Sequence, residues 1–485
     1  MNQCWRRFAS AFTVLGLACA GLVAGVVPAF AAPPITTQPY TTLLGIDQLH
    51  AQGLDGAGVK IALIDGPVDT TVPELQGVTV IKKAFCPITY APHSIAHATE
   101  IASILASPYY GWAPKATILN YASPTTDDLP DGETINSAWP DCGRTDTRAY
   151  QIEQALNDGA DVISISQAGA SPGFDMTFAL VRAALKGVPV VMGVGNDSSP
   201  TIAGTASPNT VVAVGAVDAS GQRASYSNWG AGLTIMAYGG PVSARYPDTS
   251  GALSVINTAT VGTSFSTPMV AGALALAKQK WPGANGNQLE RVMFDTIDGV
   301  ADHASAQPSP DMGFGVLNAP LMVATDPSGY SSDNVLAQKS PGEHPTPDDF
   351  TAYQNGTANP ITLGADNDYV YRGCDPSILK YGIPSGMKVE ASTAPECQAT
   401  SSPSAPQTTQ IPVPVDTPAA NIPWVLIGAG VAVILVLAIV IALVLRRRKP
   451  GPPGGPPPVP PGWPSTAAAP PPVAWPPPPN LTLSA

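Results

Sequence analysis

Charged side chains are scarce in this sequence. Lys, Arg, Asp and Glu make up only 12% of the 485 residues, and the net charge is −12. No run of three or more basic residues occurs before Arg446. Because proteins that bind nucleic acids carry a concentrated positive patch, we expect no nucleic-acid partner.

Cysteine and histidine are also few, with six and five residues. No C-x-x-C pair or His/Cys spacing typical of zinc sites occurs, so we expect no metal and no cofactor. Four cysteines follow the predicted signal peptide described below. In an exported chain they are expected to form disulfides, and three connectivities are open; the local pairs Cys86–Cys142 and Cys374–Cys397 are the simplest.

Both ends of the sequence carry long apolar runs. Arg6 and Arg7 precede an apolar stretch that ends in small residues, which predicts a signal peptide over residues 1–31. A buried N-terminal helix and a lipid-modified Cys19 are the alternatives. Residues 424–445 are all apolar or glycine, and roughly 20 such residues cross a bilayer. We expect one transmembrane helix there, with a buried core helix as the alternative.

The residues beside the second apolar run predict its orientation. Basic residues 446–449 follow it directly, so the C-terminus is expected in the cytoplasm and the preceding chain outside the cell membrane. Residues 446–485 are rich in proline and form a predicted cytoplasmic tail that cannot bury a core. Residues 326–423, rich in Pro, Ser and Thr, are predicted to be an extracytoplasmic stalk; a small fold around residues 368–388 is left open as an alternative for that stretch.

The part between these segments, residues 32–325, has the pattern of an α/β domain. Short apolar runs at 59–64, 116–121, 162–165, 188–194, 211–217 and 233–237 predict buried strands. Helical patterns at 150–156, 176–185 and 265–280 lie between them. This alternation predicts a doubly wound, mainly parallel sheet with helices on both faces, and active sites in such sheets lie at the carboxyl ends of the strands.

One motif carries a strong resemblance to a known family. Gly262-Thr263-Ser264-Phe265-Ser266-Thr267-Pro268-Met269-Val270-Ala271-Gly272 resembles the nucleophile motif of the subtilisin-like serine proteases, or subtilases. Ser264 is expected to open a helix, where unpaired N–H groups stabilise developing negative charge. Pro268 is expected in the first helical turn, and Ala271 and Gly272 allow close packing.

A serine nucleophile needs a base and a carboxylate that orients the base. Asp65 ends an apolar strand and, like the following Val68-Asp69, resembles the family's aspartate segment, although Gly66-Pro67 replaces the usual Ser/Thr-Gly. His97 resembles the family's base, at the predicted start of a helix, although Ala98 replaces glycine. The nearby His93 lacks this motif. The resemblance thus implies Asp65, His97 and Ser264 as the catalytic residues.

Two further segments resemble the family's binding elements. Asn196 follows the apolar run 190–194 and matches the oxyanion-hole asparagine, which would act together with the Ser264 N–H. Ser166, Gln167, Ala168 and Gly169 resemble the strand that binds the substrate peptide, although Gln167-Ala168 departs from the family pattern. The resemblance extends over residues 40–325, so 32–325 is the predicted subtilisin-like peptidase domain.

The resemblance implies a membrane-anchored serine endopeptidase that cleaves extracytoplasmic proteins or peptides. Residues 32–64 are too few for the inhibitory prodomain of many secreted subtilases. That feature, the stalk and the membrane helix resemble mycosins, which are associated with type VII secretion, so secretion-system components are expected partners. The alternative is a weakly active or inactive subtilase fold that serves as a scaffold in such an apparatus.

Overall fold

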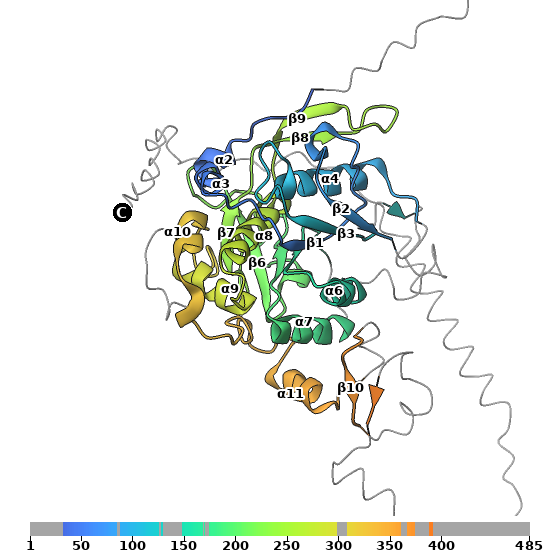
Figure 1. The fold of residues 1–485 in the computed structure, drawn as a ribbon, viewed down its shortest axis with the longest axis vertical. Coiled ribbons are helices and arrows are strands. Elements are labelled where there is room, and N and C mark those ends of the chain that lie inside the picture. Colours follow the sequence, from blue (N-terminus) through green and yellow to red (C-terminus); the bar gives the residue numbers. More distant parts are fainter. Residues whose placement is uncertain are drawn as a thin grey trace, which may run out of the picture. The chain divides into compact units, whose positions relative to one another are not determined.

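The computed structural model describes residues 33–84, 88–125, 128–129, 148–167, 169, 174–297, 308–359, 366–373 and 388–390. A seven-stranded sheet runs through the middle of the fold (Figure 1), in the order β2-β3-β1-β4-β5-β6-β7, and every pairing in it is parallel. The strands are β1 (Lys60–Asp65), β2 (Val80–Lys83), β3 (Thr117–Ala122), β4 (Val162–Ile165), β5 (Val190–Gly193), β6 (Val211–Val217) and β7 (Ile235–Tyr238).

Helices cover both faces of the sheet, as predicted. The main ones are α4 (Pro92–Ala106), α6 (Arg148–Asn157), α7 (Phe174–Lys186) and α8 (Thr263–Lys280). Helix α8 packs on β4 to β7 and against α4, whereas α6 and α7 pack together on the opposite face. Alternate residues of β1 separate the two cores: Ile61 and Leu63 belong to the first, and Ala62 and Ile64 to the second. The predicted doubly wound parallel sheet is therefore confirmed.

Several smaller elements complete the fold. Strands β8 (Val242–Tyr246) and β9 (Val255–Thr260) form an antiparallel hairpin before α8, and β10 (Val370–Tyr371) pairs with β11 (Lys388–Val389). The short helices are α2 (Tyr40–Leu43), α3 (Ile46–Ala51), η1 (Pro73–Leu75), η4 (Gly204–Ala206), α10 (Ala319–Ala324) and η6 (Pro327–Gly329), and the longer ones are α9 (Gly286–Asp295) and α11 (Pro347–Asn355).

Part of the predicted stalk is folded. Helix α11 and β10, drawn in orange beside α7 in Figure 1, follow the peptidase-like part of the chain. They are joined to it by Arg182 of α7, which is only 1% exposed. Its guanidinium forms ion pairs with Glu153 of α6, with Asp366 (3.1 Å) and with Asp368 (2.8 Å). Proline-rich composition therefore did not prevent structure here, because a buried charge cluster holds the segment.

A second contact from the same region involves Lys339. Its ammonium donates hydrogen bonds to three main-chain carbonyl groups, those of Ala206 (2.9 Å), Val211 (2.8 Å) and Gly232 (3.1 Å). Burial lowers the pKa of Lys339 to about 7, although the charges of Glu290 and Glu343 raise it. Lys339 thus connects the loops on either side of β6 to the chain beyond α10.

Several predicted features lie outside the described residues. These are the signal peptide over 1–31, the transmembrane helix over 424–445, the tail over 446–485 and all four cysteines expected to form disulfides. Within the described part of the chain, no helix has both the length and the apolar character needed to cross a bilayer. The boundaries of the five predicted segments stay predictions.

Candidate active site

Asp65 lies at the carboxyl end of β1, in the middle of the sheet. Its side chain is fully buried, and Oδ1 accepts hydrogen bonds from the Gly66 N–H (2.7 Å) and from the His97 ring (2.9 Å). The second oxygen, Oδ2, accepts none from the described residues. A buried carboxylate is costly unless its charge has partners; besides these two contacts, the charge of Arg148 interacts with Asp65.

The loop after β1 is fixed by two polar side chains. The Asn120 amide of β3 donates to Gly66 O (3.1 Å), and its oxygen accepts from the Val68 N–H (3.0 Å). Thr99 of α4 accepts from the Asp69 N–H (2.9 Å). A β-carbon on residue 66 would lie 2.4 Å from Ser94 O, so α4 approaches this loop too closely for the usual serine or threonine. Glycine at this position follows from that approach.

His97 lies in the sixth position of α4, because this helix begins at Pro92 and not at His97 as predicted. Its side chain is about a third exposed, at 32%, while Asp65 is buried beneath it. Burial alone lowers the pKa of His97, but the charge and hydrogen bond of Asp65, with a contribution from Glu100, raise it above its usual value. The neighbouring Ala98 is fully buried, so α4 accommodates the methyl group that replaces the family's glycine.

Ser264 is the second residue of α8. Every residue of this helix from Thr263 to Ala277 is buried except Ser264, which is half-buried at the edge of the core. Gly272 allows the close packing that was predicted, since a β-carbon there would lie 2.4 Å from Cβ of Trp112. The N–H of Ser264 belongs to the first helical turn, whose donors have no acceptor within the helix.

Pro268 lies inside α8 and not in its first turn as predicted. Proline has no N–H, so it cannot donate to the carbonyl four residues earlier, which is that of Ser264. That carbonyl accepts from the Ser166 hydroxyl instead (3.0 Å), and Ser264 Oγ donates to Ser166 O (3.1 Å). The two serines therefore form a reciprocal pair of hydrogen bonds.

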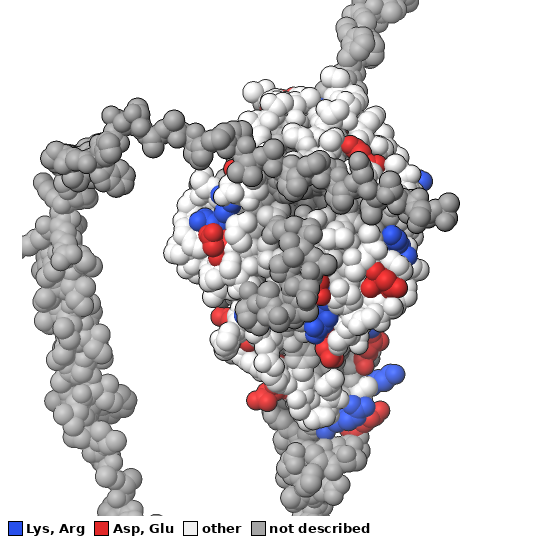
Figure 2. Space-filling model, turned by 90° about the vertical axis from the view of Figure 1, so that its left-hand side faces the viewer, with Lys and Arg blue, Asp and Glu red and all other residues white. Residues whose placement is uncertain are grey.

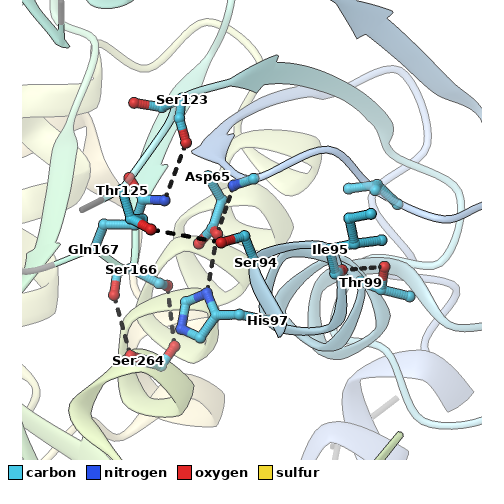
Figure 3. Close-up of polar contacts among 12 residues, drawn as sticks. Asp65, Ser94, Ile95, His97, Thr99, Ser123, Thr125, Ser166, Gln167 and Ser264 are labelled. Carbon is cyan, nitrogen blue, oxygen red and sulfur yellow. Dashed lines mark hydrogen bonds and ion pairs between the residues drawn. The ribbon is translucent and has the colours of Figure 1, made fainter. Parts of the chain in front are cut away.

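The three predicted catalytic side chains lie in one place (Figure 3). The imidazole of His97 lies between Asp65 and the start of α8, with Nδ1 facing the carboxylate. Ser264 and His97, both among the described residues, share no hydrogen bond, because the Ser264 hydroxyl is turned toward Ser166. Catalytic hydrogen bonds are often formed only when substrate is bound.

Asn196 lies just beyond β5, close to the start of α8. Its Oδ1 accepts from the N–H (2.8 Å) and the hydroxyl (3.0 Å) of Thr263. With the oxygen held in this way, the Nδ2 donors lie toward Gly262, where a β-carbon would be 3.4 Å from Nδ2. The N–H of Ser264 lies close to the same position, since its nitrogen is 3.7 Å from that β-carbon.

The predicted substrate strand is described in part. Ser166 and Gln167 directly follow β4 and are buried, and the Gln167 amide donates to Ser123 O (3.4 Å). Gly169 lies near the Arg148 guanidinium, 2.8 Å from the position of a β-carbon on that glycine. Ala168 lies outside the described residues.

Sequence reasoning missed three residues that support this site. Asn120 and the hydroxyl of Thr99 fix the loop after Asp65, and Glu100 lies one helical turn after His97. A polar residue in the middle of the apolar stretch 117–122 was a signal for Asn120. Glu100 gave a similar signal, because a carboxylate next to the apolar Ile101 of the predicted helix stands where burial of a charge is costly.

Three comparisons bear on what this arrangement is. Residues 56–316 match the sequence profile of the family described as the subtilase family. Subtilisin DY of Bacillus licheniformis is 31% identical over 279 residues, which are 55% of this chain and 93% of that protein. Subtilisin BL of Lederbergia lenta is 33% identical over 255 residues, or 51% and 86% of the two chains. The solved structure of the prenylagaramide maturation protease PagA is similar over 58% of this chain and 97% of its own, with 24% identity and a TM-score of 0.46.

Proposed function

This chain belongs to the subtilase family of serine endopeptidases, and from that premise we propose that Asp65, His97 and Ser264 form its catalytic triad. The observation that carries the proposal is the 2.9 Å contact between His97 Nδ1 and Asp65 Oδ1, beside the half-buried Ser264 (Figure 3). Asp65 holds the imidazole by Nδ1, so that Nε2 is the nitrogen left to accept a proton.

The proposed reaction begins when the Ser264 hydroxyl turns from Ser166 O toward His97 Nε2. His97 takes the hydroxyl proton as Oγ attacks the carbonyl carbon of the scissile peptide bond, and a tetrahedral intermediate forms. His97 then gives that proton to the leaving amine, which leaves an acyl-enzyme on Ser264. A water molecule loses a proton to His97 and attacks the ester carbon; the bond to Ser264 Oγ then breaks, His97 gives its proton to that oxygen, and the second product leaves as a carboxylic acid.

Asn196 is proposed to bind the oxyanion of the tetrahedral intermediate together with the Ser264 N–H. The fixed orientation of its amide, with Oδ1 held by Thr263, supports this role. Donors that are oriented in advance stabilise the charge that develops in the transition state without reorganising. Ser166, Gln167, Ala168 and Gly169 are proposed to lie along the substrate peptide at the end of β4.

The cellular setting is proposed from the sequence alone. A signal peptide, a membrane helix over 424–445 and the basic residues after it would hold the peptidase outside the membrane and the C-terminus in the cytoplasm. Extracytoplasmic proteins or peptides would be the substrates. The mycosin-like organisation would make components of a secretion apparatus its partners.

On the face that Figure 2 shows, acidic and basic residues are intermixed.

The second candidate is a subtilase fold that acts as a scaffold with little or no activity. The hydrogen bond from Ser264 to Ser166 favours this candidate, because it holds the hydroxyl away from His97. The two candidates differ in whether the hydroxyl can turn and react.

Labelling with a fluorophosphonate serine probe tests both. Under the triad proposal the wild-type chain labels, and Ser264→Ala does not; Ser166→Ala, which removes the neighbouring hydroxyl but keeps the nucleophile, still labels. A folded wild-type chain that neither labels nor cleaves a peptide would support the scaffold. Labelling of Ser264→Ala at the wild-type rate would show that another residue is the nucleophile.

A further inference from the structure

A buried carboxyl group lies one helical turn beyond His97. Glu100 of α4 is only 8% exposed, and its buried side-chain oxygen Oε1 has no hydrogen-bond partner among the described residues. Other buried glutamates have partners: Glu74 is paired with Arg245, Glu153 with Arg182, and Glu290 accepts from Asn334. A buried acid without a partner is costly in its ionised form, so its position calls for an explanation.

The cavity beside Glu100 does not supply that partner. Glu74, Arg245 and Tyr110 line the same cavity, together with Ser103 and Phe265. The Arg245 guanidinium is already used, because it donates to both oxygens of Glu74 (2.6 and 2.9 Å). Burial raises the pKa of Tyr110, so its phenol remains neutral. The charge of Arg245 is therefore neutralised on the side of the cavity.

The charged groups of the active site that interact with Glu100 are His97, on its own helix, and Asp65, from β1. Residues three apart on a helix are neighbours, with β-carbons about 5–6 Å apart. Burial raises the pKa of Glu100 to about 8, His97 lowers it and Asp65 raises it. Glu100 is therefore largely protonated at pH 7 and ionised above pH 8, within the range where peptidases are assayed.

We propose that Glu100 is a positioning residue that acts through His97: when Glu100 ionises, a second negative charge beside the imidazole strengthens the base and increases the rate of cleavage. The step releases the Glu100 proton to solvent and forms no bond to substrate. The ionised Glu100 acts through its negative charge. His97 is an imidazolium in the transition state, and the carboxylates of Asp65 and Glu100 both stabilise that positive charge. This inference rests on the proposed triad.

The pH dependence of kcat/KM tests it. The wild-type chain should show two rises, one as His97 loses its proton and a second centred near pH 8. Glu100→Gln keeps the size and shape of the side chain but cannot ionise, so the second rise should disappear. One pKa unit of stabilisation corresponds to tenfold, so we expect about a tenfold lower kcat/KM above pH 9 and nearly equal values at pH 7.

Glu290→Gln is the matched control. Burial also raises the pKa of Glu290 to about 8, but this residue lies on α9 beside Asn334 and away from His97. Glu290→Gln should keep both rises. The proposal is wrong if Glu100→Gln also keeps both, or if Glu290→Gln removes the second one.

A measurement without activity separates this inference from the triad itself. In a Ser264→Ala background, the imidazole resonances of His97 followed by NMR should show an inflection near pH 8. In Ser264→Ala/Glu100→Gln it should be absent. Loss of the inflection supports the role of Glu100 even if the nucleophile is misassigned. An unchanged inflection overturns the role of Glu100 and does not affect the proposed triad.

Discussion

Replacement of Arg182 by methionine should destabilise the folded chain strongly. The guanidinium compensates Glu153 and Asp366, both buried, and the exposed Asp368, and Met keeps much of the side-chain volume without the charge. Removal of one partner from a buried ion pair leaves an uncompensated charge, which costs about 3–5 kcal/mol of unfolding free energy. We expect a loss in this range at pH 8.

The loss should depend on pH with a definite sign. Burial raises the pKa of Glu153 to about 8, although Arg182 lowers it, so without Arg182 the native-state pKa is higher still. Between the unfolded value of about 4.5 and this raised value, the native chain binds more protons than the unfolded chain, and stability falls as pH rises. Below pH 8 Glu153 is protonated in the native chain with or without Arg182, so the difference appears above that pH: Arg182→Met should cost less at pH 8 than at about pH 9.5, and Glu153→Gln in the same chain should remove most of that difference.

Urea unfolding at both pH values gives the free energies, and hydrogen exchange shows where the protection is lost. Exchange should increase first at Val370 and Tyr371 of β10, because Asp366 and Asp368 join that segment to α7 through Arg182. Lys186→Met is the control: its pair with Asp368 is exposed at both ends (40% and 62%), so the change should be about 0–1 kcal/mol. A loss below about 1 kcal/mol for Arg182→Met at pH 8 would refute the reasoning.

Four further predictions follow from the site, the fold and the sequence. Asn196→Ala should lower kcat by about 100- to 1,000-fold while the serine probe still labels Ser264, and full activity of this variant would exclude Asn196 from the oxyanion site. Ser264→Ala, His97→Ala and Asp65→Asn should each remove most cleavage, and the double variants should resemble the single ones. The native pKa of Lys339 is about 7 and its unfolded value about 10.5, so the unfolded chain binds more protons between these values. Thermal unfolding should therefore show the stability of the wild type rising relative to that of Lys339→Met from pH 7 to pH 10. Parallel curves of stability against pH for the two proteins would contradict this. Peptide mapping without reductant should find no free thiol at Cys86, and an alkylated Cys86 would exclude the Cys86–Cys142 bridge. Protease added to intact cells should remove the peptidase domain and leave a short tail fragment, and digestion of the tail from outside would reverse the predicted orientation.

Buried strands were the most predictable part of the fold. The apolar runs 162–165 and 211–217 coincide with β4 and β6, because strands covered on both faces need apolar residues at every position. Edge strand β2 was missed, since its two lysines and partial exposure leave little apolar signal. The β8–β9 hairpin was missed as well; β9 is exposed along most of its length, so burial did not shape its sequence.

The candidate site was predictable in its residues but not in its hydrogen bonds. Motif resemblance indicated Asp65, His97 and Ser264, and the structure brings them together. The predicted start of α4 at His97 is five residues too late, because the helix begins at Pro92, a residue favoured at the first helical position. The orientation of the Ser264 hydroxyl toward Ser166 depends on a side-chain rotation, which no sequence pattern encodes.

The contacts of Lys339 have a consequence for how the chain responds to its surroundings. Three main-chain oxygens that converge on one point would repel one another without a positive charge between them, and here that charge is covalently attached. A tethered ammonium cannot be diluted away, sequestered by a chelator or exchanged for another ion. The contacts of Lys339 with the loops before and after β6 therefore need no diffusible ion, and the charge that makes them depends on pH.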